Sequence, residues 1–200
     1  MYVLGITGSL GSGKSTVAQM LRRKGALIVD ADKVSHGFLA PGTSCFRRIV
    51  QCFGTAVLVK GRIDRRRLAK IVFYDPRSLK RLTAILHPEI AKMIRKMIRG
   101  YQKKYVRGVI GIDAPLLFEM GLEKICDAVV VVRATRAQQI ERTHARSGLT
   151  HIEILKRMKA QMPIQKKIAR ADFVIDNQGN INQTRKQVEE LWQRQVKTKR

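Results

Sequence analysis

The chain has few of the residues that hold small secreted domains together. It contains three cysteines among its 200 residues, and no two of them form a C-x-x-C pair. An odd number of scattered cysteines argues against a regular disulfide framework and against the common zinc motifs. We therefore expect Cys45, Cys52 and Cys126 to be reduced thiols, buried or incidental, in a cytoplasmic protein.

Long apolar runs are also absent. No stretch approaches the ~20 apolar residues that a membrane-spanning helix needs. The first apolar stretch runs directly into a glycine-rich loop, which is not the pattern of a signal peptide. We expect neither a membrane partner nor a secretory signal.

Acidic residues are scarce relative to basic ones. The sequence has 15 Asp and Glu against 40 Lys and Arg, which gives a formal net charge of +25. A field of this sign attracts anionic ligands and binds polyanions without selectivity. Aromatic residues for base stacking make up only 6% of the chain and no nucleic-acid-binding motif is present, so we expect no specific nucleic acid partner. The end of the chain, 197–200, is predicted to be a solvated basic segment.

The stretch Gly8–Ser15, GSLGSGKS, carries the strongest functional signal. It follows an apolar run that predicts a buried strand and precedes a helical pattern, which is the context of a phosphate-binding loop. Glycines let the backbone N–H groups converge on phosphate oxygens, and the helix N-terminus adds its positive dipole end. Lys14 would reach the β- and γ-phosphates, and the Ser15 hydroxyl would bind Mg²⁺. The alternative is a glycine-rich turn with an incidental lysine, which the flanking strand and helix disfavour.

Further continuous apolar runs predict the other buried strands of a parallel sheet, at 26–29, 109–113, 127–132 and 171–176. Ligands of such sheets lie beyond the carboxyl ends of the strands. The acids at the carboxyl ends of the first two of these runs are therefore expected near the phosphate loop: Asp30 and Asp32 after 26–29, and Asp113 at the end of 109–113.

One of Asp30 and Asp32, with Asp32 favoured, could accept the proton of an attacking hydroxyl, and the other could orient Mg²⁺ or a neighbouring group. The alternative is that Asp30 or Asp32 only caps a helix beginning near Lys33. Asp113 fits the second carboxylate of nucleotide sites, which holds Mg²⁺ directly or through water.

The region from residue 33 to about 107 is predicted to be helical, basic and without strands. Helices are expected at 44–53, near 61–68 with Asp64 as cap, at 77–86, and at 89–101. His87-Pro88 is expected to interrupt the last two.

Two polar helices, 135–146 and 151–161, are predicted to form a mobile lid that brings Arg142 or Arg146 onto phosphates. The alternative is an ordinary solvated hairpin. The segment 177–180 is predicted to be a turn before a closing amphipathic helix at 181–195.

Taken together, these pieces resemble the dephospho-CoA kinase family over nearly the whole length. The phosphate loop alone is shared by many families, whereas the later motifs are far more specific in combination. The residues that carry the resemblance are Gly5–Gly8 with Gly11–Thr16, Asp30–Asp32, Gly61–Arg65 with Leu68, His87-Pro88, Pro115–Glu119, Gln138 with Arg142 and Arg146, Gln161, and Ala171-Asp172 with Ile175–Gly179.

The resemblance implies an α/β fold: a P-loop NTPase-type three-layer sandwich with a five-stranded parallel sheet, a helical substrate-binding insertion and a helical lid. The nucleotide-binding core would comprise residues 1–31, 107–135 and 170–200. Residues 32–106 would bind the acceptor, and residues 136–169 would form the lid.

The implied reaction transfers the γ-phosphate of ATP, with Mg²⁺, to the 3′-hydroxyl of dephospho-CoA. Asp32 would be the base, and Lys14 and Arg142 would stabilise the phosphoryl group in transit. Ser15 would hold Mg²⁺, with Asp113 as a further contributor. Implied ATP contacts are Gly11, Ser12, Gly13, Lys14, Ser15, Thr16 and Arg146. Implied acceptor contacts are Thr7, Asp32, His36, Arg65, His87 and Leu116.

Several alternatives stay open. Both histidines of the implied acceptor site could be packed structural residues, and for His87 the expected helix break favours that reading. Ser9-Leu10 and Ser147 depart from the usual family residues without removing a required functional group. A GTPase is disfavoured because no Asn-Lys-x-Asp segment exists. Another P-loop small-molecule or nucleotide kinase is the nearest rival, followed by an ATP-regulated nucleic-acid-binding protein.

Overall fold

The computed structural model describes the backbone of residues 1–197 and the side chains of residues 1–194, so positions 198–200 of the predicted basic end lie outside the described residues. The chain forms two compact units, residues 1–30 with 95–200 and residues 31–94. Within residues 1–197, no helix is both long and apolar enough to cross a membrane.

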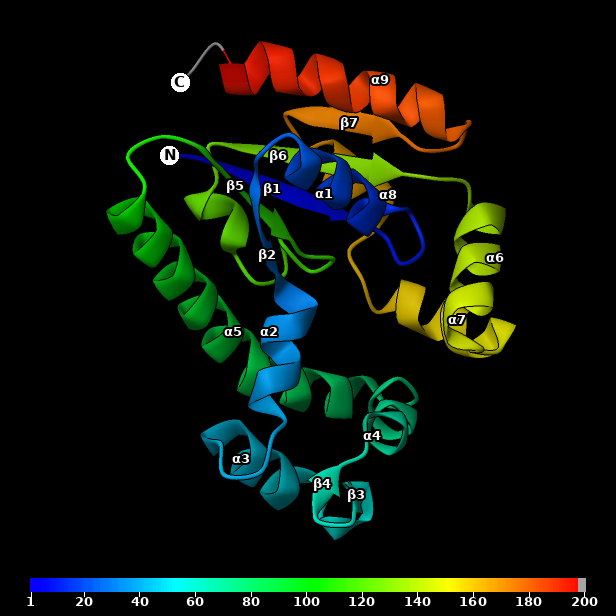
Figure 1. Cartoon of the computed structure of the whole chain (residues 1–200). Helices are drawn as coiled ribbons and strands as arrows, with labels where there is room; N and C mark the ends of the chain where they lie inside the picture. Colours follow the sequence, from blue (N-terminus) through cyan, green and yellow to red (C-terminus); the bar gives the residue numbers. More distant parts are fainter. Residues whose placement is uncertain (198–200) are drawn as a thin grey trace. The chain divides into compact units, whose positions relative to one another are not determined.

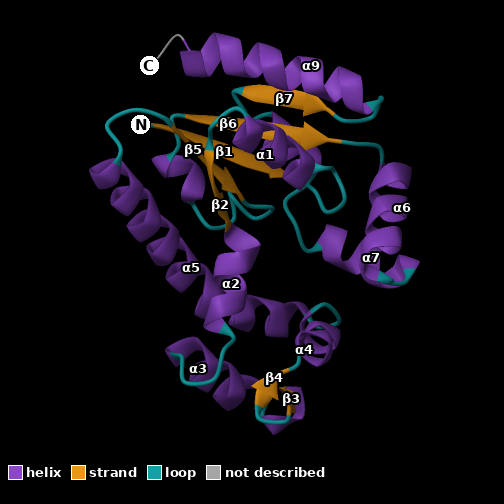
Figure 2. Cartoon of the chain, viewed as in Figure 1, coloured by secondary structure: helices purple, strands orange, loops and turns teal. Residues whose placement is uncertain are grey.

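The first unit is built on a five-stranded sheet with the order β2-β5-β1-β6-β7, in which every pairing is parallel. Figure 2 shows these strands in orange. The predicted five-stranded parallel sheet is confirmed. Its strands are β1 (Tyr2–Gly8), β2 (Leu27–Asp30), β5 (Val109–Asp113), β6 (Ala128–Arg133) and β7 (Phe173–Asp176).

Helical layers cover both faces of this sheet, as the three-layer prediction requires. On one face, alternate residues of β1 pack against α1 (Lys14–Arg23) and α9 (Ile181–Leu191) in a continuous apolar cluster that includes Leu4, Val17 and Val188. Figure 1 shows α1 and α9 on this side. On the other face, a Cβ placed on Gly5 would lie within 3.0 Å of Leu117 and Cys126, so the segment after β5 packs closely there.

The remaining elements of this unit lie between strands of the sheet along the chain. The 3-10 helix η2 (Leu122–Ile125) precedes β6, and α6 (Arg136–Ser147), α7 (His151–Lys159) and α8 (Ile164–Ile168) lie between β6 and β7. Thr135 and Thr150 cap α6 and α7, whose predicted positions are confirmed to within two residues. The short α8 was not expected. The closing helix α9 ends at Leu191, and a π-helical turn follows at Trp192–Lys197.

The second unit is mostly helical, as predicted. It comprises α2 (Ala31–Phe38), α3 (Ser44–Phe53), the 3-10 turn η1 (Thr55–Val57), α4 (Arg65–Val72) and the first part of α5 (Pro76–Lys104). Asp64 caps α4 by accepting hydrogen bonds from the backbone N–H groups of Arg66 and Arg67, which confirms the predicted cap. The same bonds, first of all the one from Arg67, lower the pKa of the Asp64 carboxyl.

The expectation that this region lacks strands is wrong. Strands β3 (Leu58–Val59) and β4 (Arg62–Ile63) form a small antiparallel hairpin of its own. Each strand has two residues, which is too short to give a recognisable alternation. The hairpin does not extend the main sheet.

The predicted helix break at His87-Pro88 is also wrong, because α5 runs without interruption from Pro76 to Lys104 with Pro88 inside it. Proline removes the bond that its N–H would give to the carbonyl of residue 84. Ala84 and Pro88 are both exposed, so water can satisfy that carbonyl. The apolar face of the helix, including the buried Ile94, is unaffected.

Candidate active site

The phosphate loop connects β1 to α1. β1 is the middle strand of the sheet. The strands β2 and β5, which come next along the chain, lie on one side of it, and the later strands β6 and β7 lie on the other. The crevice beyond the carboxyl end of such a strand is where open α/β sheets bind ligands. Gly11 and Gly13 have φ angles of 73° and 93°, which curl the loop into the N-terminus of a ten-residue helix. Unpaired helix N–H groups there make a site suited to anions.

Lys14 and Asp113 meet at the edge of the loop. Lys14 is the first residue of α1 and Asp113 is the last residue of β5, which pairs with β1. The Nζ and Oδ1 atoms lie 4.0 Å apart, and the two side chains are 11% and 9% exposed. Such limited exposure makes this charge attraction stronger than that of a surface pair. Asp30 is aligned with Asp113 on the neighbouring strand.

Helix α6 packs directly on the loop. A Cβ on Gly11 would overlap the carbonyl oxygen of Gln139 and lie 2.6 Å from Oγ1 of Thr143, so only glycine fits this approach. Around this contact lie four buried side-chain polar atoms that have no hydrogen-bond partner among the described residues. They are Ser12 Oγ, Gln139 Oε1, Arg142 Nη1 and Thr143 Oγ1.

Unpaired buried polar groups cost about 1–3 kcal/mol each. Four of them around one loop indicate a place where a polar ligand can complete the hydrogen bonding. Three of these side chains, all except the Gln139 carbonyl, can donate a hydrogen bond to an anionic oxygen.

The segment after α7 also contacts the loop. Oε1 of Gln161 accepts a hydrogen bond from the backbone N–H of Leu10 at 3.0 Å, and the neighbouring Met162 N–H donates to Glu119 at 2.8 Å. Further along, the Lys167 ammonium donates to the carbonyl of Pro115 at 2.5 Å and lies 3.3 Å from the Glu119 carboxylate. The Lys167 side chain is 0% exposed. Desolvation is the main cause that lowers its pKa, and the Glu119 charge opposes it.

In the second unit, Asp32 lies in the first turn of α2, which begins at Ala31 directly after β2. The helix therefore starts two residues earlier than expected, and Asp32 is an exposed residue inside it. His36 and Arg65 come together although 29 residues separate them, because a guanidinium nitrogen contacts the imidazole Nε2. His87 is half-buried within α5.

The structure also shows where the other predicted site residues lie, but their roles stay predictions. Thr7 is buried and its hydroxyl donates to the Pro115 carbonyl at 3.3 Å. Ser15 and Thr16 lie in the first turn of α1, Leu116 is half-buried after β5, and Arg146 is exposed one turn beyond Arg142. Sequence reasoning missed the contacts of Gln161, Lys167 and Asn177 with this region. Gln161 belongs to one of the motifs that carry the family resemblance, which by itself predicts no role for it.

The oxygen donors near the loop suit Mg²⁺, which proteins bind through one or two carboxylates together with substrate phosphates and water. Asp113 supplies a carboxylate on a side chain that is 9% exposed, and Ser15 supplies a hydroxyl. No cluster of three or more His, Cys, Asp or Glu within the described part of the chain could hold a metal by itself. The donor set therefore fits an ion that arrives with a nucleotide.

The sheet order and the loop place this chain among the P-loop α/β proteins, whose loop binds nucleoside triphosphates. Comparison with known proteins narrows this class. The family model described as dephospho-CoA kinase matches residues 2–183, and the chain belongs to that family.

Individual relatives agree with this assignment. A dephospho-CoA kinase of Carboxydothermus hydrogenoformans is 40% identical over 93% of this chain and 90% of its own length. One from Syntrophotalea carbinolica is 44% identical over 98% of this chain and 93% of its own. The structure of a dephospho-CoA kinase from Campylobacter jejuni matches with a TM-score of 0.72 at 26% identity, and the match covers 99% of this chain and 98% of that one.

Proposed function

We propose that the protein transfers the γ-phosphate of ATP to the 3′-hydroxyl of dephospho-CoA and releases CoA and ADP, the last step of coenzyme A biosynthesis. The observation that carries the proposal is the family match over residues 2–183. The unpaired polar atoms around the phosphate loop support it, since they suit the oxygens of a triphosphate. A cytoplasmic reaction without a specific nucleic acid or membrane partner is part of the proposal.

In this reaction Asp32 accepts the proton of the 3′-hydroxyl as its oxygen attacks the γ-phosphorus, and the bond to the β-phosphate oxygen breaks. Lys14 and the loop N–H groups stabilise the charge on the phosphoryl group. Arg142 supports the same charge through its buried Nη1, which has no hydrogen-bond partner among the described residues. ATP contacts are assigned to Gly11, Ser12, Gly13, Ser15, Thr16 and Arg146.

Ser15 and Asp113 would hold Mg²⁺, which neutralises phosphate charge when it is bound with ATP. The acceptor is itself an anion through its diphosphate, so basic side chains favour its binding. Acceptor contacts are assigned to Thr7, Asp32, His36, Arg65, His87 and Leu116. The residue ranges assigned to the core, the acceptor region and the lid also belong to this proposal.

The test is ADP release from ATP and Mg²⁺ with and without dephospho-CoA, in the wild type and in Asp32→Asn. We expect ADP only when dephospho-CoA is present, and a loss in kcat on the order of 100-fold or more in the variant. Asp75→Asn is the matched control, because it also changes a carboxylate of the second unit, one that caps the start of α5, and it should keep its activity.

Stimulation by adenosine or a nucleotide instead of dephospho-CoA would overturn the acceptor and keep the kinase. Absence of stimulated turnover with any alcohol would overturn the kinase assignment itself.

A further inference from the structure

Asn177 links the end of β7 to the phosphate loop. The residue is 7% exposed and follows β7 directly. Its Nδ2 donates to the carbonyl oxygen of Ser12 at 2.9 Å, across 165 residues of sequence. Its Oδ1 accepts a hydrogen bond from the hydroxyl of Thr184, on α9, at 2.8 Å. Both ends of the buried amide are therefore paired.

The chemistry of these partners fixes which way the amide points. The Ser12 carbonyl can only accept a hydrogen bond, so the amide must present its NH₂ group there. The Oδ1 atom then faces Thr184, whose side chain is fully buried. Because Thr184 can donate to this oxygen, its hydroxyl stabilises the orientation that serves the loop.

The hydrogen bond to Ser12 sets the direction of a loop N–H group. The carbonyl of Ser12 and the N–H of Gly13 belong to one planar trans peptide unit, in which they point in opposite directions. Holding the carbonyl toward Asn177 therefore turns the Gly13 N–H away from it. A Cβ on Gly13 would overlap Nδ2 of Asn177, so the glycine permits this close approach.

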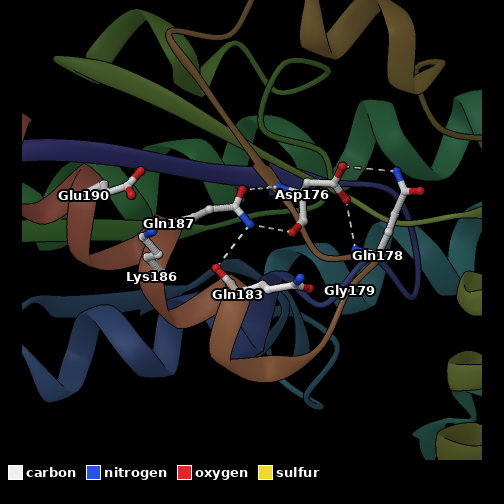
Figure 3. A pocket seen from close by; sticks show the side chains of 7 residues that line it. All are labelled: Asp176, Gln178, Gly179, Gln183, Lys186, Gln187 and Glu190. Carbon is white, nitrogen blue, oxygen red and sulfur yellow. Dashed lines mark hydrogen bonds between the residues drawn. The ribbon is translucent and has the colours of Figure 1, made fainter.

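The backbone around Asn177 is itself held in place. Its N–H donates to the Arg133 carbonyl at 2.8 Å. One residue earlier, both backbone groups of Asp176 are hydrogen-bonded to the side-chain amide of Gln187, each at 2.8 Å. Figure 3 shows this amide and Asp176 facing each other in a pocket beside α9. The polar groups of this pocket largely bond one another, which favours a supporting role over a ligand site.

Asn177 also contacts the helix that carries the proposed catalytic arginine. Its carbonyl oxygen accepts a hydrogen bond from Nη2 of Arg142 at 3.2 Å. Asn177 therefore forms hydrogen bonds with both the loop carbonyl of Ser12 and Nη2 of Arg142. The other terminal nitrogen of this guanidinium, Nη1, has no hydrogen-bond partner among the described residues.

We propose that Asn177 is a positioning residue for nucleotide binding, held in its working orientation by Thr184. It acts through the Ser12–Gly13 peptide, whose N–H it directs to the phosphates, and it has no contact with the reacting atoms. The inference rests on the proposed binding of ATP by this loop.

The test compares Thr184→Val with Thr184→Ser. Valine keeps the size of the side chain and removes the hydroxyl, without touching the loop, whereas serine keeps the hydroxyl. Ser78→Ala is the matched control, because it deletes another buried hydroxyl, one that is 3% exposed and bonded to Asp75 at 2.6 Å in the second unit.

Calorimetric titration with ADP and Mg²⁺ should give a Kd about 10-fold higher for Thr184→Val, which corresponds to the loss of one hydrogen bond. Thr184→Ser and Ser78→Ala should stay near the wild-type value. Kd for dephospho-CoA should not change in any variant. Equal ADP affinity in Thr184→Val and the wild type would overturn the positioning role.

A second measurement separates this role from the proposed function. In the ligand-free protein, the NMR signal of the Gly13 amide should shift in Thr184→Val and not in Ser78→Ala. A wild type that binds no ADP would overturn the proposed function together with the nucleotide role, whereas an unshifted Gly13 signal would overturn the positioning alone.

Discussion

The polar contacts of the two compact units join residues at very different separations along the sequence. In the first unit, the phosphate loop is held by Gln161 and Asn177, which lie 151 and 165 residues away from their partners. In the second unit, most side-chain hydrogen bonds are local, such as the cap of α3, where Thr43 accepts from the N–H of Phe46 three residues on. Longer contacts there include the His36–Arg65 pair and the thiol of Cys45 on a carbonyl of α5, 29 and 40 residues apart.

This difference has a physical consequence. Closing a long stretch of chain costs entropy that only a folded unit can offset, so the loop geometry exists only when β7, α6 and α9 are in place. Local caps form with their own helix and depend on little else. Substitutions of the residues that support the loop should therefore disturb stability and nucleotide binding together, whereas loss of a local cap in the second unit should lower stability alone.

The largest expected contrast is between two glycine-to-alanine substitutions. Gly13→Ala places a methyl group on Asn177 at a φ of 93°, and it should destabilise the protein by about 3 kcal/mol or more and abolish ATP binding. Gly37→Ala adds a methyl group within α2 where nothing lies within 4 Å, and it should stabilise by about 0.5–1 kcal/mol. Urea unfolding measures both. A stable Gly13→Ala protein that binds ATP would contradict the close packing of the loop.

The next effect comes from the buried ammonium of Lys167. Lys167→Met leaves the Glu119 carboxylate without its cation. Oε2 of Glu119 already has no hydrogen-bond partner among the described residues. Removing one partner of a buried pair costs about 3 kcal/mol or more, and the Glu119 side chain, at 19% exposed, favours the lower figure. The double variant Lys167→Met with Glu119→Gln should recover part of this loss. Equal stability of the single variant and the wild type would mean that the pair is not buried in solution.

The same lysine predicts a pH dependence. Burial lowers the pKa of folded Lys167 below its ordinary value of 10.5, so between these two values the unfolded chain binds more protons than the folded protein. The stability that this group contributes is therefore present above pH 10.5 and is lost as the pH falls through the folded pKa. The difference in unfolding free energy between the wild type and Lys167→Met should grow as the pH is raised through the folded pKa toward 10.5. A difference that shrinks with pH would contradict the direction of the shift.

These contacts also show what sequence alone could predict. The sequence predicts a strand at Val109–Asp113 with the bounds that the structure shows, because an unbroken run of four residues without a polar side chain ends there in an acid. The phosphate loop is predictable from sequence because its glycines meet a local requirement for positive φ angles. The hydrogen bond from Asn177 to Ser12 is not predictable from sequence, since it depends on how β7 and α9 pack around α1.

The two errors in the second unit have local causes. Lys60 and Gly61, between β3 and β4, have φ angles of 48° and 72°, as a tight hairpin turn requires. Lys-Gly is not among the usual sequence signals for that turn, and the strands are too short to help. Pro88 predicts a break because proline opposes helix, but the exposed carbonyl it leaves costs little while the buried face of α5 continues.

The smallest predicted effects sharpen the comparison most directly, because they use the same change in both units. Thr43 and Thr135 cap α3 and α6 in the same way, each accepting a hydrogen bond from the N–H three residues on. Replacing either threonine by alanine should cost about 1 kcal/mol. The cap of α6 differs in its surroundings, because the Gln138 that completes it also donates to the carbonyl of Gln178 at 2.7 Å, next to Asn177.

Thr135→Ala should therefore weaken ADP binding a few-fold in addition to its loss of stability, whereas Thr43→Ala should lose stability alone. Thermal unfolding and calorimetric titration on both variants measure the two quantities. If ADP affinity fell equally in both, the caps of the second unit would influence the loop as strongly as those of the first. The separation into long-range and local contacts would then have no consequence for binding.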